Sequence, residues 1–314
     1  MTVFIATLNQ TAFLLLFILA GYVLAKKKFV PDNAQAVLSK LENTLFIPAL
    51  VLGTFMNNFT AQTIADAWKL LLGSLVLAAA AIALSLLCVR FCSKDKYEQN
   101  IYTYGLSFSN FGFMGNAVVS ALFPEIFLEY LIFTLPLWVL IYLWGVPVLL
   151  MGSSAEKQTL AQRAKSFVNP MFVCMLLGML IGLLKIPVPK FVSSAVSTAG
   201  SCMSPVAMLL TGMTIAKFNL REVLGIKGVY LVTALRLLVF PLLFLGALLV
   251  FPMPETFAVC AICSLSMPLG LNTIIIPSAL GKDTKVASGM ALVSHILSCL
   301  TIPMVFMLFQ YIPR

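Results

Sequence analysis

Charged residues are scarce in this chain. Asp, Glu, Lys and Arg make up 10% of its 314 residues, whereas hydrophobic residues make up 61%. Soluble domains carry about 25% charged and roughly 45–50% apolar residues, so this composition predicts a protein that uses the lipid bilayer as its solvent. The net charge of +9 does not indicate nucleic-acid binding, because the basic residues lie in short clusters between apolar runs, as in loops that face an anionic membrane surface.

The signatures of enzymes, metals and cofactors are also absent from the sequence. It contains no G-x-x-x-x-G-K-[ST] loop for nucleotides and no H-E-x-x-H zinc motif. Seven cysteines are present, but the spacing Cys260-x-x-Cys263 lacks the second pair that a metal site would need. We therefore expect small buried cysteines, no metal, no cofactor and no enzymatic activity.

Ten segments are apolar over about 20 residues, the length that crosses the hydrocarbon core. The first apolar run ends at Lys26-Lys27-Lys28 without a small-residue cleavage site, so we expect it to remain as a span. The sequence predicts an all-α membrane protein whose ten transmembrane helices lie at 5–25, 36–57, 68–91, 99–123, 126–151, 168–186, 191–216, 226–251, 256–280 and 285–311.

Lysine and arginine residues indicate how these spans are oriented. Because cytoplasmic loops are enriched in both residues, the termini are predicted to lie outside the cytoplasm of a plasma (cell inner) membrane. By the same rule, the charged segment 153–166 is predicted to be a cytoplasmic linker. The basic residues gather in every second loop: Lys26, Lys27, Lys28 and Lys40, then Arg90, Lys94 and Lys96, then Lys157, Arg163 and Lys165, then Lys217, Arg221 and Lys227, and finally Lys282 and Lys285.

Two of the spans carry residues that interrupt a helix. Residues 264–281 contain Pro268, Gly270 and Pro277, and proline removes a backbone donor and clashes with the preceding turn. Residues 107–123, S-F-S-N-F-G-F-M-G-N-A-V-V-S-A-L-F, form a second such stretch in the other half. Unwound backbone persists in a membrane only where protein or a water-filled cavity shields it. Two broken helices in corresponding halves therefore indicate a transporter's binding site.

The two halves of the chain share a register. Pro48 in the second span corresponds to Pro205 in the seventh, at an offset of 157 residues. Ser120-Ala121-Leu122 likewise corresponds to Ser278-Ala279-Leu280, at an offset of 158. Since each repeat has five spans, the second copy begins on the opposite side of the membrane, and the sequence predicts an inverted repeat.

Six short motifs, in the right order along nearly the whole chain, resemble the auxin efflux carrier family, which comprises bacterial membrane transport proteins related to the plant auxin exporters. They are L-F-I-P-A-L-V-L-G, N-F-G-F-M-G, S-P-V-A-M-L-L-T-G-M, L-R-L-L-V-F-P, S-M-P-L-G-L-N and S-H-I-L-S-C-L-T-I-P. Ser109 departs from the plant pattern, which has proline there, and Asn116 stands where bacterial relatives often have proline. We therefore expect a sharper break in span nine than in span four.

The resemblance implies how the spans are used. The first repeat, 1–152, and the second, 167–314, would supply scaffold spans 1, 2, 6 and 7 and a mobile transport bundle of spans 3–5 and 8–10. It further implies elevator-type alternating access, with the broken spans four and nine crossing at the substrate site. A homodimer is compatible with this plan.

The crossing supplies the candidate substrate-binding residues. At a broken helix, free N–H groups and the positive end of a half-helix dipole attract anions, and asparagine amides both donate and accept. The alternative is that the asparagines and serines only satisfy backbone groups freed by the kinks. We predict substrate contacts from Ser107, Ser109, Asn110, Gly112 and Asn272, with Pro268 and Gly270 shaping the backbone and, by the resemblance, Ile47 and Val51 forming the scaffold wall.

Four ionisable residues could assist transport. Arg236 lies deep inside a predicted span, where it either attracts an anion into the cavity or snorkels to the interface. His295 could carry a coupled proton because it titrates near neutral pH, or it is a polar residue bonded within the bundle. Glu42 and Asp66 are alternative proton carriers, and we interpret both as solvated charges at helix ends.

These features predict a secondary active transporter of a small organic anion, either an auxin-like acid or a dicarboxylate such as malate or malonate. A sodium-coupled symporter resembling the bile acid carriers is one alternative, because it shares the inverted five-span plan, although the crossing offers amides and hydroxyls but no carboxylate. A membrane sensor with a transporter-like body is the other. The coupled ion is left open between a proton and sodium.

Overall fold

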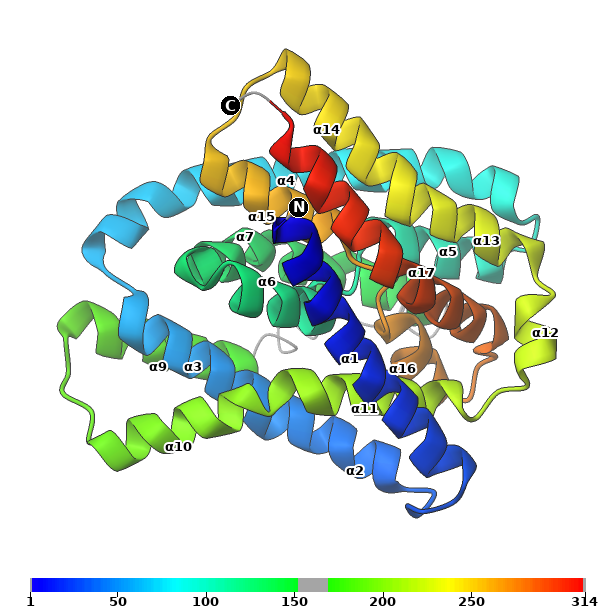
Figure 1. The fold of residues 1–314 in the computed structure, drawn as a ribbon, viewed down its shortest axis with the longest axis horizontal. Coiled ribbons are helices and arrows are strands. Elements are labelled where there is room, and N and C mark those ends of the chain that lie inside the picture. Colours follow the sequence, from blue (N-terminus) through cyan, green and yellow to red (C-terminus); the bar gives the residue numbers. More distant parts are fainter. Residues whose placement is uncertain (1, 152–168, 313–314) are drawn as a thin grey trace.

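The computed structural model describes residues 2–151 and 169–312, which are helical throughout apart from turns and one isolated β-bridge (Figure 1). The linker predicted at 153–166 lies outside the described residues. Seven helical segments are long and apolar enough to cross a membrane, and they match predicted spans 1, 2, 3, 5, 7, 8 and 10. They are Leu8–Lys26, Ala34–Asn58, Ala61–Cys92, Pro124–Met151, Lys190–Ile215, Lys227–Val250 and Lys285–Gln310.

The other three predicted spans appear as shorter apolar helices, Phe111–Leu122, Pro170–Leu184 and Glu255–Ser266. At a rise of 1.5 Å per residue, the helix Pro170–Leu184 is only about 22 Å long, less than the ~30 Å hydrocarbon core. The all-helical multi-span fold is thus confirmed, whereas ten spans and the inverted repeat stay predictions.

Three of the seven long helical segments contain turns of π-helix, which carry the label η, as does a short 3₁₀ turn. The first half contains α1 (Thr2–Lys26), α2 (Ala34–Leu41), η1 (Glu42–Phe46), α3 (Ile47–Asn58), α4 (Ala61–Cys92), α5 (Lys96–Ser107), η2 (Phe111–Gly115), α6 (Asn116–Leu122), the 3₁₀ turn η3 (Pro124–Ile126), α7 (Phe127–Leu140) and η4 (Ile141–Met151). The second half contains α9 (Pro170–Leu184), α10 (Lys190–Ser201), α11 (Met203–Ile215), α12 (Leu220–Leu224), α13 (Lys227–Ala234), η6 (Leu235–Val239), α14 (Phe240–Val250), α15 (Glu255–Ser266), α16 (Asn272–Ala279) and α17 (Lys285–Gln310).

Local sequence accounts for several helix ends. The Asp95 side chain accepts a hydrogen bond from the Glu98 amide at 2.8 Å and caps α5. Asn169 caps α9 in the same way, and Pro170 follows it at a position where its missing N–H has no partner in any case. Lys185 ends α9 in the left-handed conformation, with φ of 52°.

Two of the π-helical turns end shortly before a proline. Pro48 follows η1 by two residues, and Pro241 follows η6 by two residues. A proline ring clashes with the carbonyl four residues earlier, and a wider π turn relieves such a clash without ending the helix. Glu42 opens η1 and Arg236 lies in η6, so each proline helps set the position of a buried charged residue.

Helices that are far apart in the sequence pack side by side. In the lower part of Figure 1, α3 packs against α9 and α10, and α1 crosses α11. Helices α4, α13, α14 and α15 lie in the upper part, and α6 and α7 lie near the centre. The division into a scaffold and a transport bundle stays a prediction.

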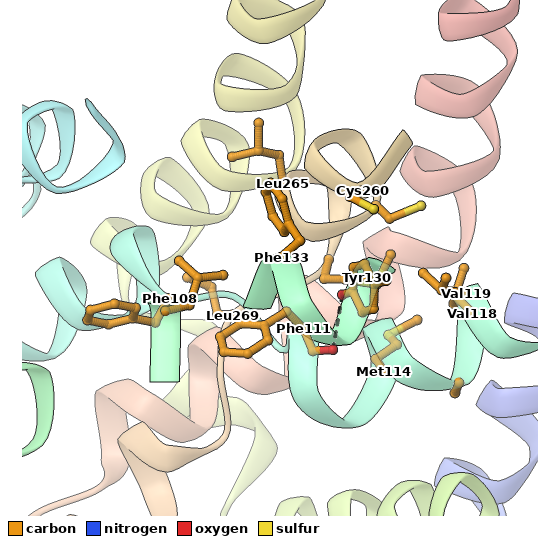
Figure 2. Close-up of a cluster of buried hydrophobic side chains, with 14 of the residues drawn as sticks. Phe108, Phe111, Met114, Val118, Val119, Tyr130, Phe133, Cys260, Leu265 and Leu269 are labelled. Carbon is orange, nitrogen blue, oxygen red and sulfur yellow. Dashed lines mark hydrogen bonds between the residues drawn. The ribbon is translucent and has the colours of Figure 1, made fainter. Parts of the chain in front are cut away.

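Aromatic and sulfur-containing side chains fill the space around the broken segments. Figure 2 shows Phe108, Phe111, Met114, Tyr130 and Phe133 from the first half against residues of the second half, such as Leu269. All of these side chains are buried. The Tyr130 hydroxyl donates to the carbonyl of Phe111 at 3.1 Å, which fixes the start of η2 against α7. The core therefore holds the breaks in a defined geometry.

Candidate substrate site

The two predicted breaks are both present. Helix α5 ends at Ser107, three residues are unwound, and the helix resumes at Phe111. Helix α15 ends at Ser266, and five residues are unwound before Asn272. Met267 is extended, with φ of −71° and ψ of 148°, because the residue before a proline is driven out of the helical region. The longer break falls in the second half, as expected from Pro268.

The unwound segments cross in contact with each other. Ser109 and Leu269 form an antiparallel β-bridge, and the backbone N–H of Asn110 donates to the Pro268 carbonyl at 2.7 Å. A Cβ atom on Gly270 would lie 2.8 Å from the carbonyl oxygen of Phe108. Glycine is therefore required there for the two backbones to approach this closely.

Arg236 ties the crossing together from one side. Its guanidinium donates to the carbonyls of Leu106 at 2.8 Å, Ser264 at 2.9 Å and Met267 at 3.3 Å. The side chain is 1% exposed, so it does not snorkel to the interface. The carbonyls at the end of a helix lack intrahelical partners and carry about half a negative charge. One arginine thus offsets the negative partial charge at the C-terminal ends of both α5 and α15.

The crossing also encloses a cavity of about 20 Å³, which Arg236 does not line. The N-terminal end of η2, at Phe111 and Gly112, lines it, as do the unwound residues Gly270 and Leu271 and the first residue of α16, Asn272. Helix N-terminal ends present unpaired N–H groups and partial positive charge. The two faces of the crossing therefore differ in polarity, with bound carbonyls beside Arg236 and N–H ends beside the cavity.

Asn110 and His295 form a buried pair beside this cavity. His295 Nδ1 lies 2.7 Å from the Ala291 carbonyl, which can only accept, so Nδ1 carries the proton. His295 Nε2 then accepts from Asn110 Nδ2 at 3.0 Å. Asn110 Oδ1 is buried without a partner. The histidine is therefore neutral in this arrangement and orients the Asn110 amide, which leaves an acceptor atom unused.

The remaining predicted site residues have separate roles in the geometry. Ser109 Oγ donates to the Ser264 carbonyl at 2.7 Å, and Asn272 Nδ2 donates to the Tyr104 hydroxyl at 2.9 Å. Ser107 Oγ has no partner and lines a cavity of about 10 Å³ beside Arg236, but not the crossing cavity. Pro268 lines neither cavity and acts on the backbone alone.

The two predicted wall residues lie at a neighbouring cavity. Ile47 and Val51 of α3 line a space of about 30 Å³, together with Gly112 and Asn116. Trp138 of α7 lines both this space and the crossing cavity. Its ring packs edge-on against that of Phe111, with 5.1 Å between the ring centroids. Trp138 was missed by sequence reasoning, because an aromatic residue in an apolar run carries no signal of its own.

A helical membrane fold built around two crossing, interrupted helices defines the class as a membrane transporter. Residues 6–306 match the family described as "Membrane transport protein", and the chain belongs to this family of auxin efflux carriers. An uncharacterized transporter of Schizosaccharomyces pombe is 34% identical over 104 residues, which cover 33% of this chain and 23% of that relative. The protein is therefore a multi-pass membrane protein of a membrane transport family.

Proposed function

We propose that the protein is a secondary active transporter of a small organic anion, an auxin-like acid or a dicarboxylate such as malate or malonate. The substrate binds in the crossing cavity, against the N-terminal ends of η2 and α16, with Asn110 and Asn272 beside it. The protein itself lies in a plasma membrane, with both of its termini outside the cytoplasm.

The unequal polarity of the crossing supports an anionic substrate. On one face the carbonyls of Leu106, Ser264 and Met267 all accept from Arg236. On the other face, the helix ends at Phe111 and Asn272 line the cavity with positive partial charge. Because Arg236 offsets the negative helix ends, the positive ends are left to act on a ligand, which favours a carboxylate.

Arg236 also weakens the case for sodium coupling at this place. A sodium ion needs several oxygen ligands, as hard cations do. The backbone carbonyls that converge between α5 and α15 are already bound to the guanidinium, whose own charge repels a second cation. We therefore propose that the fixed arginine fulfils at the crossing the role that a bound cation would otherwise have.

The size of the cavity supports a mechanism with motion. A volume of about 20 Å³ holds roughly one water molecule and is too small for a dicarboxylate. Among the described residues, Gly112, Phe113 and Trp138 line both this cavity and the one of about 30 Å³ next to Ile47 and Val51. Sliding of the bundle that carries Trp138 along α3 and α9 would merge the two spaces, as elevator-type alternating access requires.

Uptake of labelled carboxylates into proteoliposomes tests this function. The panel contains indole-3-acetate, malate, malonate and an uncharged analogue of similar size, with pH and sodium gradients imposed separately. We expect uptake of at least one carboxylate without sodium and none of the uncharged compound. Binding of a carboxylate without flux would indicate a sensor, and strict dependence on a sodium gradient would indicate the symporter alternative.

A further inference from the structure

Glu42 is a buried carboxylate with no visible partner. It is 0% exposed, and neither of its side-chain oxygens has a hydrogen-bond partner. The expectation of a solvated charge at a helix end was therefore wrong. The residue opens the π-helical turn η1 ahead of Pro48, and π turns inside helices are frequent at functional sites.

Among the described residues, the helices packed against η1 carry no buried charged side chain. The turn η1 packs against α2, α3, α9, α10 and α11. Their ionisable residues are Lys40 on α2, Cys174 on α9 and Lys190 on α10, and both lysines are exposed. The ion pair found among the described residues joins Lys285 to Glu222 instead. An ionised Glu42 would thus be buried and unpaired.

We propose that Glu42 is a proton-binding site and that it holds its proton as long as η1 stays packed against α10 and α11. Burying an unpaired carboxylate is far costlier than burying the neutral acid. The proton can therefore leave only when these helices separate and admit water. Protonation of Glu42 is in this way linked to a movement within the predicted scaffold.

A cavity on the same helix face offers an entry for water. Gln35 lies seven residues before Glu42, which is about two turns or ~10 Å along the helix. Its Nε2 donates to Thr214 Oγ1 of α11 at 2.7 Å, and its Oε1 is buried without a partner. Gln35 lines a cavity of about 410 Å³ between α1, α2 and α11, together with Lys26, Lys28 and Lys217. Opening of the Gln35–Thr214 contact would extend this cavity toward Glu42.

Infrared spectroscopy of the protein in lipid nanodiscs tests the protonation directly. At neutral pH we expect wild type to show the C=O stretch of a protonated carboxylic acid and Glu42→Gln to lose it. Glu125→Gln removes an exposed carboxylate and should keep the band. Glu129→Gln should keep it as well, which excludes the other glutamate with a buried unpartnered oxygen. An identical band in wild type and Glu42→Gln would overturn the proposal, as would loss of the wild-type band on adding sodium chloride.

A flux measurement tests the link to movement, and this part alone depends on the proposed transport function. With labelled malonate, or another carboxylate that wild type carries, an imposed pH gradient should change uptake in wild type and Glu125→Gln. We expect the pH response to be lost in Glu42→Gln. An unchanged response in Glu42→Gln would overturn the link. If wild type carried none of the carboxylates, the transport function would fail while the infrared band still decided the state of Glu42.

Discussion

Arg236 Nη1 donates to the carbonyl oxygen of Leu106 at 2.8 Å, although the two residues are 130 positions apart in the chain. The same guanidinium reaches Ser264 in the other broken helix at 2.9 Å. One side chain in η6 thus joins the C-terminal ends of α5 and α15, and it supplies the positive charge that these two dipole ends require. The stability of the crossing should therefore depend strongly on this residue.

Arg236→Met should destabilise the protein severely. Three buried carbonyls would lose the arginine as a donor, and only that of Ser264 would keep the Ser109 hydroxyl. Each buried group left unsatisfied costs about 1–3 kcal/mol. We expect a large drop in the thermal unfolding temperature in detergent. Arg236→Lys should recover only part of it, because an ammonium cannot reproduce the guanidinium fork. Arg90→Met, at an exposed position, is the matched control. Equal unfolding temperatures for both methionine variants would show that Arg236 does not stabilise the crossing.

Gly270→Ala should separate the two unwound segments. The added Cβ would meet the Phe108 carbonyl oxygen at 2.8 Å, and that atom belongs to the backbone and cannot rotate away. We expect lower thermal stability and loss of carboxylate uptake. Gly246→Ala in α14 provides the control, since its Cβ would meet nothing within 4 Å and alanine favours a helix by up to about 1 kcal/mol. Normal uptake by Gly270→Ala would show that close approach at the crossing is not needed.

His295→Leu should weaken substrate binding, because the histidine orients the side-chain amide of Asn110. The substitution removes the acceptor of the Asn110 amide at 3.0 Å, and a hydrogen bond of about 1.5 kcal/mol corresponds to roughly a tenfold change. We expect a rise in the substrate concentration for half-maximal uptake, with the protein still folded. His295→Gln retains a side-chain acceptor and should restore part of the affinity. Equal affinity in wild type and His295→Leu would assign the histidine to packing alone.

The positions of the breaks could be predicted from local chemistry. Pro268 forbids a regular helix at Met267, and the serines and glycines around Asn110 weaken the helix before it. The longer break at Pro268 follows from the same rule. These effects act within a few residues, so the sequence is sufficient to locate them.

The partners of buried charges could not be predicted in the same way. Arg236 bonds to backbone carbonyls, which every residue possesses, so no side-chain pattern marks Leu106 or Ser264 as its acceptors. Glu42 lies next to the exposed residues Asn43 and Thr44, and its burial depends on α10 and α11, which come much later in the chain. Contacts of this kind arise from tertiary packing and become visible only in the folded chain.

Uptake by Asn110→Ala in proteoliposomes tests most directly whether an anion binds at the crossing. The control is Asn58→Ala, which removes an exposed amide that bonds only to the Thr54 carbonyl at 2.9 Å. With the labelled carboxylate that wild type carries, we expect Asn110→Ala to lose uptake while the protein stays folded, with an unfolding temperature below that of Asn58→Ala because His295 Nε2 loses its buried partner. Wild-type uptake kinetics in a folded Asn110→Ala protein would contradict a substrate site between the two broken helices.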